Sequence, residues 1–424
     1  MRAPALWLMV LITVSAGPSA FAEEPPAADS PSSLTLADCY ALALKRSETV
    51  AIQRELITQT EGQFLQALSG ALPNVSYNIS QTRQDGTGSS NFSLRDIPER
   101  KFTLSQPLFS GFKEFAAIAG AGAERRQRKQ ERARAEQLLL GDVSDAFYLV
   151  LEQREDLATL EATRSALMQR IDDLQDREKL GRSRPSEVAS AEAQLRRTEA
   201  ELELVRGKET TARQLLEFLT GLPQLQALND EGLELGTPDA EAAYTTLVDQ
   251  RPDVQAKEAA WRVARDVVWG AQATLWPDVD LESNYYTKRA GNAADIDWDV
   301  ILKVSIPLFQ GGDAVGSVKE TRSLARQAKL DYERTKREAL LEIRETHAKL
   351  SAELTRLHAL QHALEAAEED YRLQQEDYRL SLVNNLEVLR ALEALQESRR
   401  DVLGSRYAAK RLYWQLRTST GRAG

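Results

Sequence analysis

The sequence predicts a mainly α-helical protein with a small β part, built as two tandem repeats of a long antiparallel helical hairpin and two strands. The first supporting observation is a phrase that occurs twice, since SQPLFSGF at 105–112 returns as SIPLFQGG at 305–312. The second is that a long stretch without proline, rich in Ala, Glu, Leu, Arg and Gln, follows each copy. The third is the alternation of apolar and polar residues before each copy, which indicates strands.

The N-terminus has the layout of a secretory signal peptide, which we place at residues 1–22. Arg2 supplies the positive charge, an apolar stretch follows, and AFA at 20–22 is a small-x-small cleavage pattern. The apolar stretch is too short to serve as a retained membrane anchor. Residues 23–35 form a polar, proline-bearing linker. We therefore expect the mature chain to start near Glu23 and to work outside the cytoplasm.

Charge and cysteine content exclude several classes of protein. The net charge is −10, and both signs are mixed along the chain, so the sequence carries no basic stripe for nucleic acid. The one cysteine, Cys39, cannot form a disulfide within the chain, and we expect it to be a buried thiol.

The first structural repeat covers 36–221 and the second covers 239–421. Matching phrases support this division, because LTG at 219–221 meets STG at 419–421, an offset of 200. The same offset separates the two copies of the opening phrase. Self-similarity at a fixed offset indicates duplication of one structural unit.

Each repeat is predicted to open with a helix, at 36–69 in the first and at 239–274 in the second. A much longer helix follows the strands, at about 113–180 and about 313–380. A helix of that length extends for about 100 Å at 1.5 Å per residue. Such a rod needs partners along its length, so we expect the opening helix to cover one half of it.

The other half of each long helix is predicted to pack against the helix that follows it. Apolar residues recur at spacings of three and four from Val188 in the first repeat and from Val388 in the second. This spacing is typical of helices that pack lengthwise by knobs into holes. The connecting tips, at 181–186 and 381–385, are short, so each pair of helices is antiparallel.

The strands are expected at about 74–83 and 100–108 in the first repeat, and at about 278–287 and 298–306 in the second. Alternation with period two gives each strand one apolar and one polar face. Four strands are too few to close a membrane barrel, since the smallest barrels have about eight. The chain therefore either shares a barrel with other copies of itself or packs its strands as a small patch in a water-soluble protein.

The repeated phrase is expected to mark the point where a strand passes into a long helix. Each copy contains a proline and then a glycine, Pro107 and Gly111 in the first repeat and Pro307 and Gly311 in the second. Proline and glycine punctuate regular structure, and the helical period begins directly after each glycine.

Several of these phrases resemble the TolC-type family of outer-membrane efflux and secretion channels. They are LPNVSYNIS at 72–80, the paired phrase itself and YRLSLVNNLEVLRALEAL at 378–395. The resemblance implies a homotrimer with a helical α-barrel in the periplasm and a shared transmembrane β-barrel in the outer membrane of a Gram-negative bacterium. It also implies a passive exit duct without enzymatic activity or cofactor. The implied partners are a periplasmic adaptor (membrane fusion protein), an inner-membrane transporter and outer-membrane lipid.

The resemblance further implies that the channel closes at its periplasmic helix tips. Tyr378 matches the tyrosine of the family's tip pattern, and Ser381 stands where the pattern has glycine. Glu387 keeps one of two acidic positions, whereas Arg390 replaces the other. With Glu187 at the equivalent place in the first repeat, rings of carboxylates would favour cations, and Arg390 counts against that selectivity.

Other interpretations of these tip residues remain open. Glu187 and Glu387 lie in the first turn of a helix, where a carboxylate complements the helix dipole, and for Glu187 this explanation is as strong as gating. Arg182 and Arg184 either contact an adaptor, hold the tip closed through ion pairs, or do neither.

The evidence for a metal site, for an enzyme or for another kind of transport protein is weaker. His358 and His362 have the spacing of a helical metal chelate, but they lack a matching set of carboxylates or thiolates, so we predict no metal site. The sequence carries no nucleophile elbow and no phosphate-binding loop, which argues against an enzyme. The alternative function is a soluble periplasmic coiled-coil adaptor, which would require neither two hairpins nor strands patterned for lipid.

Overall fold

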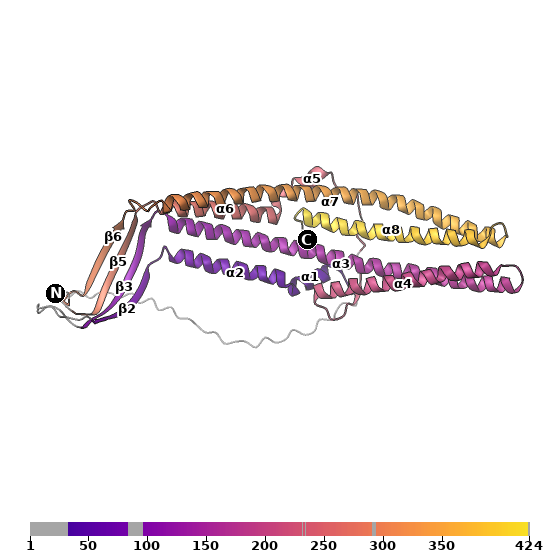
Figure 1. Ribbon diagram of the computed structural model, residues 1–424, viewed down its shortest axis with the longest axis horizontal. Helices are drawn as coiled ribbons and strands as arrows, with labels where there is room; N and C mark the ends of the chain where they lie inside the picture. The colour runs from indigo at the N-terminus through magenta and orange to yellow at the C-terminus, as the bar shows by residue number, and fades with distance from the viewer. Residues whose placement is uncertain (1–32, 84–95, 231, 234, 291–293, 423–424) are drawn as a thin grey trace.

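The computed structural model describes residues 33–83, 96–230, 232–233, 235–290 and 294–422. The predicted signal peptide at 1–22 and most of the linker at 23–35 lie outside these residues. The molecule is elongated, with the strands at one end, the turns of two long hairpins at the other, and helices running lengthwise between them (Figure 1).

The elements follow the same order in both halves of the chain. The first half contains α1 (Leu36–Arg46), α2 (Glu48–Ser69), β2 (Asn74–Arg83), β3 (Asp96–Ser110), α3 (Lys113–Lys179) and α4 (Pro185–Thr220). The second half contains α5 (Glu241–Thr245), the 3-10 turn η1 (Val248–Gln250), α6 (Pro252–Ala273), β5 (Asp278–Arg289), β6 (Trp298–Ser305), α7 (Asp313–Arg379) and α8 (Asn385–Ser419).

The prediction of one continuous opening helix per repeat is wrong in both halves. In the first, Ser47 adopts an extended backbone and its side chain accepts a hydrogen bond from the Val50 amide, which ends α1 and starts α2. In the second, Pro252 starts α6, because proline cannot continue a helix from the preceding turn. The chain before Pro252 forms only the short α5 and η1.

The four longer strands form one antiparallel sheet in the order β2-β3-β5-β6. Three of them lie where the sequence places them to within a few residues, whereas β3 begins at Asp96, earlier than expected. A row of aromatic residues crosses all four strands, because Tyr77, Phe102, Tyr285 and Trp298 are successive cross-strand partners. In this sheet, β2 and β6 each have one edge without a neighbouring strand.

The opposite face of the sheet is polar. The Asn78 amide donates to the Thr103 hydroxyl (3.2 Å), and that hydroxyl donates to the Asn284 carbonyl oxygen (2.8 Å). The Asn284 amide in turn donates to Asp299 (2.9 Å), so one hydrogen-bonded row crosses all four strands. The sheet therefore separates an apolar from a polar surface, as its period-two pattern predicts.

The helices continue the sheet as a layer. Next to the strands, α3 lies between α2 and α6, and α6 lies between α3 and α7. Beyond the ends of α2 and α6, α4 packs along α3 and α8 packs along α7 (Figure 1). The predicted apolar seam of α4 is buried from Val188 to Leu216. None of the described helices combines the length and apolar character needed to cross a membrane.

A short parallel pair of strands was not predicted from the sequence. β1 (Ser33–Leu34) pairs with β4 (Ala227–Leu228). With two residues per strand, period-two patterning gives no signal. The pair joins the start of the described chain to the segment that follows α4, beside the core cluster that contains Cys39, which is buried.

Candidate functional site: the helix tips

The two hairpins turn through the same backbone motif. At the first tip the Gly181 amide donates to the Glu178 carbonyl (2.8 Å) and the Arg182 amide to the Arg177 carbonyl (2.8 Å), which is the Schellman pattern. At the second tip Ser381 and the residue after it make the equivalent bonds. Gly181 and Ser381 have positive φ angles of 70° and 60°, so the serine occupies a conformation that favours glycine.

Tyr378 lies at the centre of the contact between the two hairpins. Its side chain comes from the last turn of α7 and is buried. Two guanidinium groups from α3 contact its ring, Arg170 at 3.8 Å and Arg177 at 4.7 Å from the ring centroid. A cation over the face of a tyrosine ring is an attractive arrangement. We call these three side chains the tip clamp.

Asn385 extends the tip clamp into α8. It is the first residue of that helix and is 1% exposed. Its side-chain oxygen accepts a hydrogen bond from Arg170 Nε (2.9 Å), and its amide donates to the Glu187 carbonyl (3.4 Å). Arg170 therefore contacts both helices of the second hairpin, while its buried Nη2 has no hydrogen-bond partner among the described residues.

Apolar packing supports the clamp. A cluster of buried side chains joins the two hairpins at the tips, and three helices besides α7 contribute to it. Its further members are Leu167, Ile171 and Leu174 of α3, Val188, Ala191 and Leu195 of α4, and Val388, Leu389 and Leu392 of α8. Because this cluster spans both hairpins, the tips can separate only by exposing it to water.

The acidic tip residues occupy helix starts. Glu187 accepts a hydrogen bond from the Ser183 hydroxyl (2.7 Å), and Glu387 lies 3.5 Å from Arg390 in an exposed ion pair. Asn384 caps α8 by accepting from the Glu387 amide (3.2 Å). Both carboxylates therefore lie where they complement a helix dipole, and Arg390 offsets the charge of Glu387.

The remaining predicted tip residues make fewer contacts. Arg182 and Arg184 are exposed, and neither forms an ion pair with a described residue. Sequence reasoning missed Arg170, Arg177 and Asn385. The two arginines are seven residues apart on one helix, a spacing that places them on the same face, and this was the available signal.

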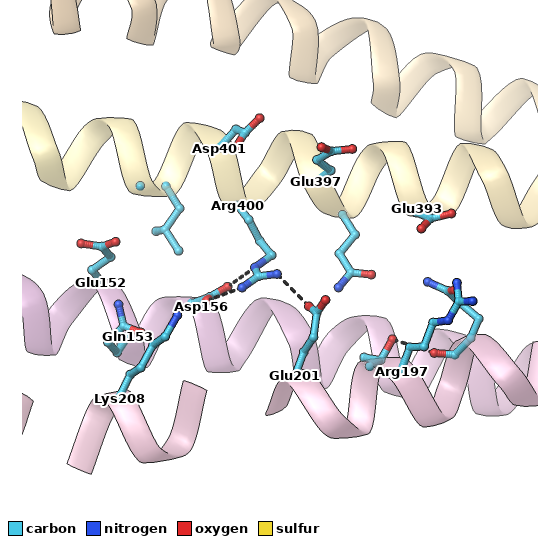
Figure 2. A pocket seen from close by; sticks show the side chains of 15 residues that line it. Glu152, Gln153, Asp156, Arg197, Glu201, Lys208, Glu393, Glu397, Arg400 and Asp401 are labelled. Atoms are coloured by element: carbon cyan, nitrogen blue, oxygen red, sulfur yellow. Dashed lines mark hydrogen bonds and ion pairs between the residues drawn. The ribbon is translucent and has the colours of Figure 1, made fainter. Parts of the chain in front are cut away.

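Behind the tips, a polar cavity of about 530 Å³ lies between the first hairpin and α8 (Figure 2). Arg400 of α8 crosses it and forms two bonds with Asp156 of α3 (2.8 and 3.1 Å) and one with Glu201 of α4 (2.7 Å). Burial lowers the pKa of Arg400, but its hydrogen bonds and the surrounding carboxylates outweigh this and raise it above its ordinary value. One charged side chain thus links three helices.

The two strand-to-helix junctions differ in how tightly they pack. Pro107 lies inside β3, beside a bulge, three residues before the strand ends at Ser110, whereas Pro307 follows β6. Proline is tolerated in a strand at such a bulge. Gly111 has a φ of 63°, and a Cβ atom there would lie 2.6 Å from the Ala273 carbonyl oxygen. Gly311 has a φ of 62° with open space around it.

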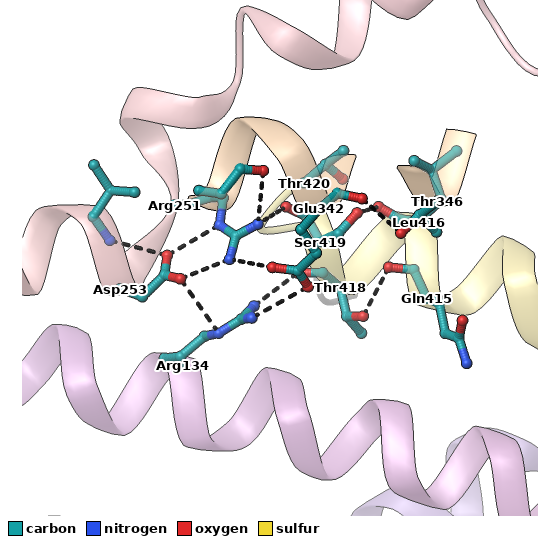
Figure 3. Close-up of polar contacts among 12 residues, drawn as sticks. Arg134, Arg251, Asp253, Glu342, Thr346, Gln415, Leu416, Thr418, Ser419 and Thr420 are labelled. Atoms are coloured by element: carbon teal, nitrogen blue, oxygen red, sulfur yellow. Dashed lines mark hydrogen bonds and ion pairs between the residues drawn. The ribbon is translucent and has the colours of Figure 1, made fainter. Parts of the chain in front are cut away.

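Midway along the molecule, Arg251 holds several elements together (Figure 3). Its side chain is 1% exposed and forms ion pairs with Asp253 (2.6 Å) and Glu342 (2.8 Å). It also donates to the Ser419 carbonyl at the end of α8 (2.8 Å). Arg134 of α3 approaches the same two carboxylates, at 3.8 and 3.5 Å.

These charges shift the ionisation of the network. Burial alone would raise the pKa of Asp253, but the hydrogen bond and charge of Arg251, together with Arg134, hold it below its ordinary value. Sequence reasoning missed this network as well. The available signal was the recurrence of KRSE at 45–48 as QRPD at 250–253.

The histidine pair, His358 and His362, has one carboxylate beside it. The His358 and His362 rings lie 4.7 Å apart, and His362 contacts Glu365 at 3.2 Å. Within the described ranges, no group of three or more His, Cys, Asp or Glu side chains is arranged to hold a metal ion.

Comparison with known proteins gives consistent matches. The family model described as outer membrane efflux protein matches residues 39–222 and 243–422. The outer membrane protein TolC of Vibrio cholerae is 22% identical over 389 residues, covering 88% of this chain and 86% of its own length. The alkaline protease secretion protein AprF of Pseudomonas aeruginosa is 22% identical, with 92% and 84% covered. The crystal structure of CusC shares the fold, with a TM-score of 0.81, 18% identity and 92% of each chain covered.

Proposed function

The chain belongs to the outer membrane efflux protein family, and on that premise we propose that three copies form a passive exit duct that is closed at rest by the tip clamp. Members of this family are outer-membrane channels with a periplasmic helical tunnel and act in transport, not in catalysis. Membership implies a trimeric component of an efflux or secretion system. The family model matches both repeats, which argues against the alternative function of a coiled-coil adaptor.

The observation that carries the assembly is the pair of free sheet edges. In the four-stranded sheet, β2 and β6 each expose one edge of backbone donors and acceptors. In lipid these groups must be paired, because no water is present to satisfy them. Pairing β2 of one copy with β6 of the next removes every edge once the ring closes, with the apolar face toward outer-membrane lipid and the polar row toward the lumen.

The helical layer continues the same ring into the periplasm. Because α2, α3, α6 and α7 follow the strands in the same side-by-side order, copies that join at β2 and β6 also bring α7 next to α2 of a neighbour. The long helices α3 and α7 contain 67 residues each, about 100 Å of length. That length suits a tunnel that projects far from the membrane.

Closure at rest is supported by the tip contacts. The tip clamp and Asn385 hold the second hairpin against the first, so that opening has to break the Arg170 contacts. Tyr378 is thus the gate residue with the strongest geometric support. Glu387 and Arg390 form an ion pair within the chain, and three such pairs would form a ring of paired charges at the pore mouth of a trimer. Glu187 lies in the first turn of α4 and serves mainly to complement the helix dipole.

The exposed Arg182 and Arg184 are the tip residues best suited to contact a periplasmic adaptor, since described residues leave their charges unpaired. An adaptor and an inner-membrane transporter would complete either a tripartite efflux pump or a type I secretion system. In such a system the transporter selects the substrate, and the duct conducts what it receives.

The assembly is tested by extracting the mature protein from membranes and measuring its cross-linked mass and its heat-modifiable gel mobility. We expect a trimer that detergent alone releases and that migrates differently before and after boiling. A monomer recovered in the periplasmic wash would overturn the proposal.

A further inference from the structure

An aromatic groove of about 460 Å³ lies between α3 and α6, next to the ends of the strands. Phe112 and Phe115 form one wall, and Trp269 and Trp276 form the other. All four side chains are more than half exposed, from 55% for Trp276 to 68% for Phe115. Exposed aromatic clusters of this kind mark sites of contact with a partner.

The groove lies on the apolar face of the sheet. Phe109 of β3 pairs in register with Val279 of β5, so both side chains point to the same face, which is also the face of Tyr285. The Phe109 ring lies 5.2 Å from that of Phe112, which in turn lies 6.1 Å from Phe115. The aromatic surface is therefore continuous from the apolar strand face into the groove.

A second copy of the chain leaves the groove uncovered. Its walls, α3 and α6, are the two inner helices of the layer, and each already has a neighbour on both sides. Copies add at the edges, formed by α2 and β2 on one side and by α7 and β6 on the other. The occupant must therefore approach the outward surface of the ring.

The spacing of the aromatic residues fits a membrane. Phe102, in the aromatic row of the sheet, precedes Phe112 by ten positions in the sequence. β3 continues for eight of these positions, to Ser110, and Gly111 and Phe112 form the turn before α3. Eight residues of strand extend for about 26 Å, or about 20 Å in height at a tilt of about 40°, and the two turn residues place Phe112 beyond that point. The apolar band of an outer-membrane protein is about 25 Å tall, with aromatic residues at both boundaries. The groove thus lies at the second boundary.

Backbone strain holds one wall of the groove in place. Phe112 is the residue before α3 and has a φ of 64°, a left-handed conformation that bulky residues rarely adopt. Such a conformation is strained and persists only where the surroundings enforce it. Here the ring contacts of Phe112 with Phe109 and Phe115 supply that constraint.

We propose that this groove binds an acyl chain of a phospholipid from the periplasmic leaflet of the outer membrane. This inference rests on the proposed function, because it requires the apolar strand face to contact lipid. Tryptophan suits this place, since its ring packs against hydrocarbon while its N–H stays near the polar headgroups. The bound chain extends the lipid contact from the strands to the first turns of α3 and the last turns of α6.

The test uses single-tryptophan variants of the full-length trimer in vesicles of phosphatidylethanolamine and phosphatidylglycerol. A fraction of the lipid carries bromine near the headgroup end of the acyl chain, where it quenches tryptophan emission on contact. One variant keeps only Trp276, a second keeps only Trp298 of the aromatic row, and a third keeps only Trp414, which packs against the core cluster beside β1 and β4, away from the four-stranded sheet.

We expect quenching of Trp276 to match that of Trp298, with no quenching of Trp414. Unquenched Trp276 beside quenched Trp298 would refute the groove and leave the membrane-spanning sheet intact. If neither is quenched, the proposed function fails together with the inference. Should a single-tryptophan variant fail to assemble, the Trp276→Phe change in the otherwise unaltered protein is compared with Trp414→Phe. Only the former is expected to lower the quenched fraction, and an equal effect of both overturns the proposal.

Discussion

Arg46 and Arg251 occupy equivalent places in the two repeats, yet their surroundings differ sharply. Arg46 ends α1 just before α2, Arg251 immediately precedes α6, and each lies against the glycine that ends its own repeat, Gly221 or Gly421. The Arg46 side chain is 58% exposed and, among the described residues, forms an ion pair with Glu48 alone. The Arg251 side chain is 1% exposed and joins three further elements. Duplication preserved the backbone position, and only the second copy became a structural anchor.

This comparison predicts a large asymmetry between matched substitutions. Arg251→Ala leaves the Ser419 carbonyl without its donor and leaves Asp253 and Glu342 with only the more distant Arg134, which costs about 3 kcal/mol or more in the free energy of unfolding. Arg46→Ala removes an exposed pair and costs less than about 1 kcal/mol. Denaturant unfolding of both variants in the same detergent measures the difference. Equal losses would show that the two arginines are equivalent after all.

A comparison of the two strand-to-helix junctions predicts a difference in stability of similar or slightly smaller size. Gly111→Ala places a methyl group against the Ala273 carbonyl as well as straining the backbone, and we expect a loss of about 3 kcal/mol. Gly311→Ala meets open space and suffers only the backbone strain, about 1 kcal/mol. Thermal unfolding and trimer yield of the pair provide the measurement. A harmless Gly111→Ala would contradict the close approach of α6.

Acid should weaken the network around Arg251 through Asp253. Because the folded pKa of Asp253 lies below its ordinary value of 3.8, the ionised carboxylate stabilises the fold above that value. The contribution is lost as the pH falls through the lowered folded pKa. Unfolding midpoints measured from about pH 5 downward should therefore decline less in Asp253→Asn, which lacks the titrating group, than in the unaltered protein. If the unfolding midpoints of the two proteins declined in parallel with pH, Asp253 would not contribute to acid stability.

Substitutions at the two helix tips should have the smallest effects on stability, and these effects should be opposite in sign. Ser381→Gly relieves a left-handed serine and should stabilise the second tip by up to about 1 kcal/mol. Gly181→Ala imposes the same strain on the first tip, where nothing crowds the new methyl group, and should destabilise it by a similar amount. Hydrogen exchange at the two turns reports both effects locally. Exchange that slows in neither variant, or changes in the same direction in both, would contradict the prediction.

The sequence predicted the hairpins well because their information is local and periodic. The seam from Val188 and the short tips follow from spacing alone, and the strands follow from alternation. The breaks at Ser47 and Pro252 were readable in principle, since a capping serine and a proline both end helices. They were missed because the apolar residues continue across each break.

The tip clamp and the Arg251 network were less accessible from the sequence. Arg170 and Tyr378 are 208 positions apart, and an arginine on a long charged helix looks the same whether it faces solvent or a ring. The bulge beside Pro107 was not predicted for a related reason, because it depends on the register between β3 and β5. These features depend on contacts between residues far apart in the chain, and local patterns in a single sequence do not reveal such contacts.

Single-channel conductance in planar lipid bilayers measures whether the tip clamp keeps the channel closed. Removing two cation–π contacts in Arg170→Ala/Arg177→Ala weakens closure by about 2 kcal/mol, which shifts the balance toward the open tip about 30-fold. We expect low conductance from the unaltered trimer and from the matched Arg182→Ala/Arg184→Ala variant, and much higher conductance from the clamp variant. Tyr378→Phe, which keeps the ring face, should stay closed. A clamp variant that conducts no better than the unaltered protein would contradict the account.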